Sequence, residues 1–341
     1  MQEITDYGKV FETLVRKTQD YIVGNNLSAM VLGISGGIDS TVVAAICHEV
    51  SKRTAIPLIG RSLPTKFNKE GEITTADLVG EAFCNDYKVY PIDRFYHQFM
   101  IDIVHKETGS VKCIQDEFTG RFTIDLEDCL KFQTPIANGN IQARLRMIYL
   151  YNLASIHGGL VMDTDNLTEN NLGYFTIHGD VGDFNPIGGL WKTEVFKLAE
   201  YLVEYYEKIS AKNDDYDEVI NSIDKNFYYN KIRAVKESLK LQPTAGLGIT
   251  SNDLEELGAE SYEQVDYILQ EILAWKYMTL WVNEVPINQT TPWEQRNAFL
   301  EEQQMLDTPI EVIIAVTDRH FKSEFKRKQL PIKLERNGLL V

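Results

Sequence analysis

The chain has 341 residues, enough for one large or two small domains with a buried core. Hydrophobic residues make up 44% and charged residues 25%, close to the average for globular proteins, which excludes disorder and collagen-like structure. The 34 Lys and Arg against 50 Asp and Glu give a formal net charge of −16. Such a charge repels polyanions and argues against nucleic acid or an anionic membrane as the main partner.

The cysteines and the N-terminal segment give no sign of an oxidising compartment. Cys47, Cys84, Cys113 and Cys129 are widely spaced and form no CxxC pair, so we expect reduced and mostly buried thiols. The N-terminus lacks the basic and apolar regions of a signal peptide, and no run of about 18 apolar residues occurs. These features predict a cytoplasmic protein.

Helical and strand patterns alternate along the first third of the chain. The order is helix 5–22, strand 28–34, helix 41–52, strand 55–61, helix 69–83, strand 87–91 and helix 95–106. Short apolar runs that alternate with helical periods predict an α/β fold, in which helices cover both faces of a parallel sheet.

The remaining segments are less regular. Residues 109–135 are of mixed polarity, and we interpret them as an insertion. A helix is predicted over 140–157, a strand over 160–162 and a further helix over 193–206. The highly charged residues 207–240 predict a second insertion, a solvated helical excursion. We therefore expect one domain over 1–330, followed by a loose tail at 331–341.

A glycine-rich loop, Ser35 to Ser40, joins a predicted strand to a predicted helix. Such loops bind anions through backbone N–H groups. It is not a Walker A loop, because Asp39 stands where that motif has lysine. An aspartate there would repel phosphate unless a divalent cation lay between them, which indicates Mg²⁺. The alternative is an ordinary turn with an acidic residue that the helix dipole favours.

Several motifs together resemble one family. Gly33 to Ser40 is similar to the SGGxDS pyrophosphate loop (PP-loop) of ATP pyrophosphatases. Further matches follow the order of the NAD synthetase family: residues 139–147 (GNxxARxRM), 163–169 (GTDxxxE), 175–180 (FTKYGD), 190–192 (LxK), 243–247 (PTADL), 262–266 (YxxxD) and 323–327 (SEHKR). The series spans about residues 30–327, and it implies a Rossmann-like adenine nucleotide alpha hydrolase fold.

The resemblance implies a ligase reaction. ATP would activate the carboxylate of nicotinic acid adenine dinucleotide (deamido-NAD) as an acyl-adenylate with release of pyrophosphate, and ammonia would then displace AMP to form NAD. Glutamine-using relatives carry a fused N-terminal glutaminase domain, whereas only about 27 residues precede the first strand here, which implies ammonia as the nitrogen source. A homodimer is also implied.

The matching positions carry the family's site residues onto this chain. Asp39, Asp180 and Lys192 would be catalytic, with Asp180 orienting ammonia or accepting its proton, and Asp39 and Glu169 would hold Mg²⁺. ATP would be bound by Gly33, Ile34, Ser35, Gly36, Gly37, Ile38, Asp39, Ser40, Thr164, Lys192 and Thr244. Deamido-NAD would be bound by Arg144, Ile177, Asp180, Asp183, Phe325 and Lys326.

Departures from the family pattern fall mainly at the dinucleotide positions. Ile177 replaces a lysine, His178 a tyrosine and Phe325 a histidine, and Gly246 replaces the aspartate of PTADL. Arg144 and Arg146 fall early in the predicted helix, where the dipole disfavours cations, so at least one is expected to have a ligand partner. Two alternatives stay open: a related pyrophosphatase that adenylates another carboxylate, and a nucleotide-binding regulator without turnover.

Overall fold

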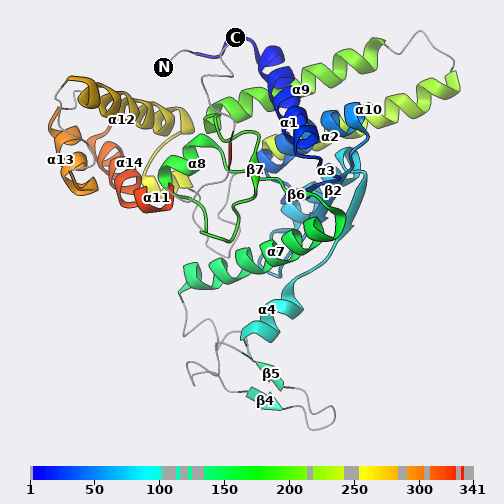
Figure 1. Cartoon of the computed structure of the whole chain (residues 1–341), viewed down its shortest axis with the longest axis horizontal. Helices are drawn as coiled ribbons and strands as arrows, with labels where there is room; N and C mark the ends of the chain where they lie inside the picture. The colour runs from blue at the N-terminus through cyan, green and yellow to red at the C-terminus, as the bar shows by residue number, and fades with distance from the viewer. Residues whose placement is uncertain are drawn as a thin grey trace.

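A four-stranded parallel sheet lies at the centre of the computed structural model (Figure 1). The structure describes residues 3–100, 102, 113–115, 122–124, 134–212, 218–241, 253–282, 290–302, 308–327 and 332–333. Across the sheet, the strands are β3 (Asp86–Val89), β2 (Leu58–Ser62), β1 (Met30–Gly33) and β6 (Leu160–Val161). In the parallel register, Val31 of β1 lies opposite Ile59 and Val161. The predicted α/β fold with a parallel sheet is confirmed.

Different helices cover the two faces of the sheet, because side chains along a strand point alternately to opposite sides. Met30 and Leu32 pack in a buried cluster with α1 (Tyr7–Gly24), α2 (Ile38–Thr54) and α3 (Glu70–Phe83). Ala29 and Val31 face the other way, against α7 (Pro135–His157). In Figure 1, α7 runs below the strands, and α1 and α2 lie above them.

Two long helices, α9 (Lys192–Lys212) and α10 (Glu218–Lys240), pack against each other and extend together in Figure 1. The helical expectation for 207–240 holds, but the expectation that this segment is solvated is wrong for the second half of α10. Lys231, Ala234, Val235 and Ser238 are buried, since α10 also packs on α3 and α2. Because most residues of this segment are polar or charged, its sequence pattern did not indicate that one face of the helix is buried.

A second core lies in the C-terminal part of the chain, where the sequence analysis assigned no elements. It is built by α8 (Leu167–Leu172), α11 (Asp253–Leu257), α12 (Tyr262–Val282), α13 (Pro292–Glu302) and α14 (Ile310–Lys322). Buried Val265, Leu269, Phe299 and Val316 lie at its centre, and the short helix α15 (Glu324–Arg327) follows. Figure 1 shows α12, α13 and α14 to the side of the sheet, with α8 between them and the strands.

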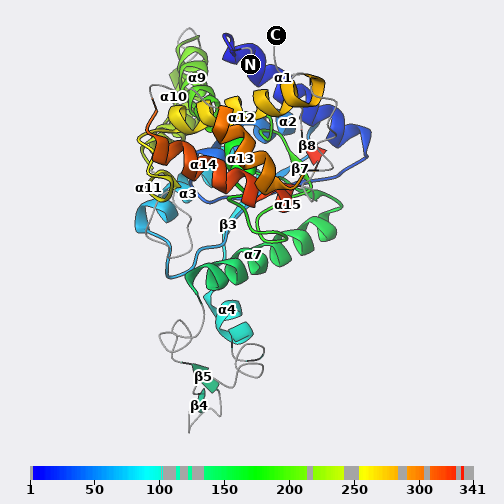
Figure 2. The same cartoon turned by 90° about the vertical axis from the view of Figure 1, so that its left-hand side faces the viewer.

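The predicted insertion at 109–135 contains a small antiparallel pair, β4 (Cys113–Gln115) and β5 (Phe122–Ile124). Figures 1 and 2 both place this pair and α4 (Asp93–Phe99) at one end of the molecule. Much of 103–133, including Cys129, lies outside the described residues, as do 331 and 334–341 of the predicted tail. Two tail residues form β8 (Ile332–Lys333), which pairs with β7 (Phe184–Asn185). The single-domain boundary stays a prediction.

Helix α7 begins five residues earlier than predicted, because Thr134 caps it and Pro135 occupies its first turn. Arg144 and Arg146 therefore lie in its third and fourth turns, too far from the helix N-terminus for the dipole to disfavour them, so the expectation of a ligand partner on that ground is wrong. Cys47 is buried and Cys84 half-buried, both as free thiols. None of the described helices is long and apolar enough to cross a membrane.

Candidate functional site

The loop between β1 and α2 is shaped to receive an anion. Gly36 has a φ of +84°, and a Cβ at this position would lie 2.5 Å from the backbone oxygen of Glu72, so only glycine fits. The hydroxyls of Ser35 and Ser40 are 3.0 Å apart, and the N–H of Gly37 donates to Ser35 Oγ at 3.2 Å. Because α2 begins directly after the loop, its first N–H groups are directed towards it, as in phosphate-binding helix termini.

Beside the loop, two carboxylates converge on one lysine. Lys192 Nζ donates to Asp39 Oδ2 at 2.6 Å and to Glu169 Oε1 at 2.9 Å. Asn166 Nδ2 donates to Asp39 Oδ1 at 2.9 Å. Burial lowers the pKa of Lys192, but Asp39 and Glu169 outweigh it and raise that pKa well above the ordinary value. The first turn of α2, helix α8 and the start of α9 thus meet at one point.

Glu169 has an unusual ionisation in this cluster. Burial and the neighbouring Asp39 raise its pKa to about 7, while Lys192 acts in the opposite direction. Its backbone N–H donates to Asn166 Oδ1 at 3.0 Å, and its own carboxylate accepts the Asn166 N–H at 3.3 Å, which forms a capping box at the start of α8. The cap fixes the direction in which Glu169 leaves its helix.

Polar residues follow β6, as the sequence predicts. The Asp163 carboxylate accepts hydrogen bonds from Asp165 N–H at 2.7 Å, Gly182 N–H at 3.0 Å and Asn185 Nδ2 at 3.2 Å. Asp165 Oδ2 is buried without a hydrogen-bond partner among the described residues. Burial and the nearby Asp163 raise the pKa of Asp165 well above its ordinary range, which favours its neutral form. Thr164, between these two, faces the cavity described below.

Asp180 lies in the loop that leads away from α8. Its Oδ1 accepts the backbone N–H of Thr176 at 2.7 Å. The pKa of Asp180 is raised to about 7, chiefly because the surrounding protein desolvates the carboxyl. The Thr176 hydrogen bond opposes this rise, the charge of Asp163 adds to it, and the charges of Lys326 and Arg146 oppose it. A carboxyl with such a pKa exchanges protons near neutral pH, as general bases do.

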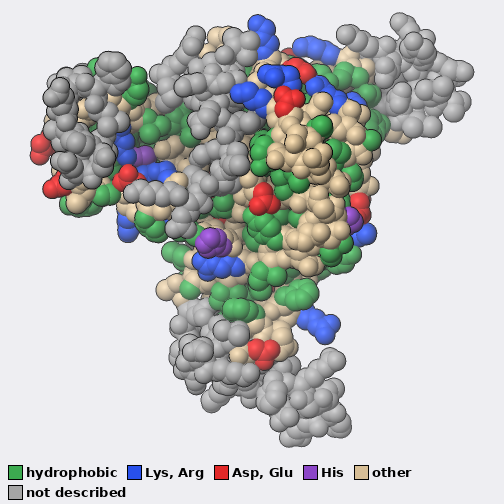
Figure 3. Space-filling model, in the orientation of Figure 1, with side chains coloured by type: hydrophobic (Ala, Val, Ile, Leu, Met, Phe, Trp, Pro, Cys, Tyr) green, Lys and Arg blue, Asp and Glu red, His purple; other side chains and the backbone are tan. Residues whose placement is uncertain are grey.

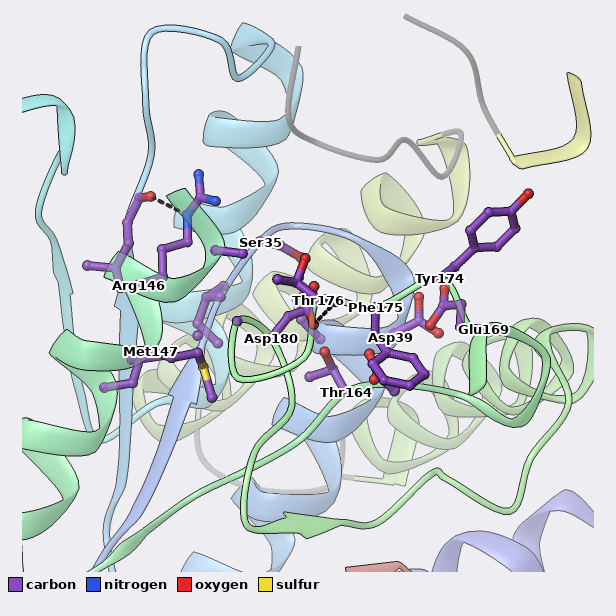
Figure 4. A pocket seen from close by; sticks show the side chains of 18 of the residues that line it. Ser35, Asp39, Arg146, Met147, Thr164, Glu169, Tyr174, Phe175, Thr176 and Asp180 are labelled. Carbon is purple, nitrogen blue, oxygen red and sulfur yellow. Dashed lines mark hydrogen bonds between the residues drawn. The ribbon is translucent and has the colours of Figure 1, made fainter. Parts of the chain in front are cut away.

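These groups surround a cavity of about 470 Å³ (Figure 4). In this view Arg146 lies at one side and Glu169 at the other, with Asp180 between them. One wall is apolar and includes Ile34, Leu63, Ile73, Ala76, Met147 and Leu150. The cavity opens at the carboxyl ends of β1 and β6, the point where strand order reverses and where α/β folds bind ligands. An apolar wall opposite a phosphate-binding loop suits a nucleotide.

Comparison with known proteins identifies the family. The NAD synthase family model matches residues 10–330. The chain belongs to the NAD synthase family. It is 30% identical to the NH3-dependent NAD+ synthetase of Campylobacter jejuni over 230 residues, 67% of this chain and 81% of that protein. With the enzyme of the same name from Methanococcoides burtonii it shares 31% over 253 residues, 74% of each chain.

Solved structures agree on the fold of this NAD synthase family member. The NMN synthetase of Francisella tularensis superposes with a TM-score of 0.61 at 23% identity and covers 95% of this chain and 97% of that chain. The NAD+ synthetase of Burkholderia pseudomallei gives a TM-score of 0.51 at 22% identity, covering 96% and 92%. The chain therefore has the adenine nucleotide alpha hydrolase fold of an ATP-dependent amide ligase family.

Most of the ATP-site residues predicted from the NAD synthase motifs come together. Gly33, Ile34, Ser35, Asp39, Ser40 and Thr164 line the cavity, as does Glu169, which was predicted as a Mg²⁺ ligand. Lys192 lies just behind it, 1% exposed and bound to two of the lining carboxylates. Gly36, Gly37 and Ile38 complete the loop without lining the cavity. Thr244 lies outside the described residues.

The predicted dinucleotide residues of the NAD synthase pattern are more scattered. Of the six, only Asp180 and Lys326 line the cavity. Arg144 is exposed, and its Nε donates to the backbone oxygen of Ile177 at 3.3 Å. Phe325 is 60% exposed on α15. The described chain therefore does not gather these six positions into one pocket.

Two of these positions bond to the protein backbone. Asp183 Oδ2 accepts the N–H of Val161 at 2.9 Å, so its carboxylate helps to end β6. Lys326 Nζ donates to the carbonyl oxygens of Gly173 at 2.8 Å and Phe175 at 2.7 Å. Burial lowers the pKa of Lys326, and nearby Arg319 lowers it further. Lys326 thus fixes the loop that carries Asp180 while it also faces the cavity.

Arg146 and Arg319 are among the cavity residues to which the sequence analysis assigned no role. Arg146 lines the cavity and donates from Nε to Leu63 O at 2.9 Å, as Figure 4 shows, whereas Arg144 lies outside. The sequence indicated that one arginine of the pair Arg144 and Arg146 would have a ligand partner, but it did not indicate which of the two faces the cavity. Arg319 of α14 also lines the cavity, with its guanidinium 4.3 Å from the Tyr174 ring centre. No element was predicted for its segment, so no signal pointed to it.

Proposed function

We propose that this chain amidates nicotinic acid adenine dinucleotide with ammonia at the expense of ATP, giving NAD, AMP and pyrophosphate. The observation that carries the proposal is the convergence of Asp39, Glu169 and Lys192 beside the glycine loop, at one end of a cavity that also holds Asp180. The family membership and the NH3-dependent synthetases among its relatives support the same reaction.

The chemistry has two steps. The pyridine carboxylate attacks the α-phosphorus of ATP, and the bond to the bridging oxygen breaks so that pyrophosphate leaves. Ammonia then attacks the acyl carbon, AMP leaves with the C–O bond electrons, and a proton is lost from nitrogen. The protein must neutralise polyphosphate charge, align the substrates and keep water from the acyl-adenylate.

Around the glycine loop, the chain supplies groups that would neutralise the charge of the polyphosphate. Backbone N–H groups at the start of α2 and the hydroxyls of Ser35 and Ser40 would hold the leaving pyrophosphate. Lys192 would act as a point charge on the phosphates, and Thr164 would donate its hydroxyl. Gly36 keeps this loop close to α3, where any larger residue would collide.

Asp39 and Glu169 are the residues that would hold Mg²⁺. Both carboxylates line the cavity beside the glycine loop, where the phosphates would enter, and Lys192 Nζ contacts one oxygen of each. Two carboxylates fit the preference of Mg²⁺ for oxygen ligands completed by phosphate and water. When bound with ATP, the ion would neutralise charge on the leaving pyrophosphate.

Asp180 is our candidate for the group that accepts the proton from ammonia. It faces the cavity on the loop after α8, away from the Asp39 and Glu169 pair (Figure 4). Its pKa, raised to about 7 chiefly by desolvation, keeps part of the population ionised at neutral pH and gives the carboxylate useful basicity.

A mononucleotide substrate is the second candidate. The NAD synthase motifs that hold a dinucleotide are altered at Ile177 and Phe325, and neither residue lines the cavity. Nicotinic acid mononucleotide carries the same reacting carboxylate without the adenylate half. The similarity to a chain named NMN synthetase is a further reason to test it.

We also propose that the chain forms a homodimer. Along α7, Ile148 is 65% exposed and Ile156 67%, with Tyr151 beside them. Figure 3 shows hydrophobic side chains gathered on the surface over α7. Apolar surface of this kind marks interaction sites.

A cytoplasmic location stays a prediction.

The decisive experiment measures AMP, pyrophosphate and amide product from Mg·ATP and ammonium with either nucleotide. NAD formation that needs all three substrates and is lost in Asp39→Ala supports the proposal. A higher kcat/KM for nicotinic acid mononucleotide than for the dinucleotide would favour the second candidate function. Cleavage of ATP only with another carboxylate, or nucleotide binding without turnover, would overturn both.

A further inference from the structure

The first turn of α9, which carries Lys192, is held by side chains from two other helices. The N–H of Lys192 donates to Thr168 Oγ1 of α8 at 2.8 Å. The N–H and hydroxyl of Thr193 both donate to Asp266 Oδ2 of α12, at 3.1 Å and 2.8 Å. Helix N-termini need such acceptors, and a carboxylate there also interacts favourably with the helix dipole.

Thr168 links the two anchors. Its hydroxyl accepts the Lys192 N–H and donates to Asp266 Oδ1 in a short hydrogen bond. Thr168 directly precedes Glu169, and Thr193 directly follows Lys192. The carboxylate of Asp266 therefore holds the side chain of Thr168, next to Glu169, and the backbone N–H of Thr193, next to Lys192.

Asp266 is placed rigidly. It is 2% exposed, and its helix neighbours Val265 and Leu269 belong to the C-terminal core. Burial raises the pKa of Asp266 to about 6, whereas the bonds from Thr168 and Thr193 lower it. One turn earlier on α12, the ring of Tyr262 lies 5.7 Å from Lys192 Nζ. Helix α12 thus holds the backbone at Thr193, directly after Lys192, and also contacts the Lys192 side chain.

We propose that Asp266 is a positioning residue, which sets Lys192 and Glu169 relative to each other and so makes ATP turnover depend on the C-terminal helices. The inference rests on the proposed function in that Lys192 and Glu169 act on ATP. A shift of about 1 Å in such groups costs roughly 100-fold in rate. Asp266 does not line the cavity, and it acts through Thr168 and Thr193.

The test compares variants that remove the link with variants that keep it. Asp266→Asn and Thr168→Val are expected to lower kcat roughly 10- to 100-fold and to raise the Mg²⁺ concentration for half-activation. Thr168→Ser keeps the hydroxyl and is expected to restore both values. Ile272→Ala, a buried change in the same core, controls for lost stability: Tm falls while kcat below the transition stays within twofold.

The outcomes separate the claims. If Asp266→Asn loses no more activity than Ile272→Ala at matched loss of Tm, or if Thr168→Val behaves like Thr168→Ser, the inference is overturned. Should Asp266→Asn fail to fold, the Thr168 pair decides alone. Should the wild-type protein form no amide, the proposed function fails, and the Tm shift produced by Mg·ATP becomes the readout. Loss of that shift in Thr168→Val with recovery in Thr168→Ser would still support the positioning role.

Discussion

Asp180 owes its proposed role to its surroundings more than to its residue type. The cavity walls desolvate it, while Lys326 and Arg146 partly offset the resulting rise in pKa. Its Oδ1 is engaged by the Thr176 N–H, which leaves Oδ2 for a substrate. At the scale of single residues, this carboxyl is therefore the group whose titration should appear in the ammonia step.

Replacing Asp180 by Asn is expected to lower kcat/KM for ammonia by roughly 10²- to 10⁴-fold, because the proton acceptor is lost. With ammonia counted as free NH3, the wild-type value should rise with pH through about 7, where Asp180 ionises, and Asp180→Asn should lack this step. Pyrophosphate exchange into ATP, which reports adenylation, should stay within a few-fold. Unchanged ammonia-dependent turnover in the variant would rule out the role.

Gly36 makes a second residue-scale prediction. Gly36→Ala would place a Cβ 2.5 Å from Glu72 O in a left-handed conformation, so the loop must shift. We expect KM for ATP to rise at least tenfold and Tm to fall. Gly24→Ala is the matched control, since nothing lies within 4 Å of its added Cβ. Equal behaviour of the two variants in ATP kinetics would contradict the shape assigned to the loop.

At the scale of elements, α10 contains a buried lysine. Lys231 Nζ lies 2.6 Å from His48 Nε2 and 3.6 Å from the Phe227 ring centre. Burial lowers the pKa of Lys231 to about 7, against the effect of Glu49, and burial together with Lys231 lowers the pKa of His48 to about 4. Helix α10 therefore packs most favourably on α2 and α3 when the Lys231 amine is neutral.

The sign of the pH effect follows. Between about pH 7 and the ordinary lysine pKa of 10.5, the unfolded chain binds more protons than the folded one, so stability rises with pH. Lys231→Met should remove this rise, up to about 1.4 kcal/mol per pH unit. Urea unfolding at pH 7.5, 8.5 and 9.5 measures it. Exposed Lys236→Met should keep the wild-type slope, and a slope that persists in Lys231→Met would refute the assignment.

At the scale of the whole molecule, a strong negative net charge is combined with exposed apolar side chains, Ile148 and Ile156, on α7. With −16 formal charges per chain, two copies repel each other at low ionic strength, and salt screens this repulsion. The proposed homodimer should therefore strengthen as salt increases, while the apolar surface supplies the attraction.

Light scattering should show a larger dimer fraction at about 200 mM salt than at about 20 mM, where screening is weaker. Ile148→Asp together with Ile156→Asp should give a monomer, because both exposed side chains lie on α7. A monomer under all conditions would contradict the proposed dimer, and a dimer that survives both substitutions would exclude α7 as its interface. Folding of the variant is checked by its Tm.

Much of the fold was accessible from local pattern. The apolar runs before Ser35 and Asp163 predicted β1 and β6, because buried strands are short and continuous. The glycine loop was equally accessible, since all of its groups lie on consecutive residues. In contrast, the charged segment that became α10 was misjudged: a few buried positions such as Ala234 and Val235 are hidden among charges that face water.

The sequence by itself determined the parallel α/β core, the glycine-rich loop and several of the residues that line the cavity beside that loop. Only the tertiary structure decided that Lys192 meets Asp39 across 153 positions, that Arg146 and not Arg144 faces the cavity, and that Asp266 anchors α9. The physical reason is range. Strand and helix periodicity act between near neighbours, whereas hydrogen-bond geometry and pKa depend on groups that packing brings together from distant segments.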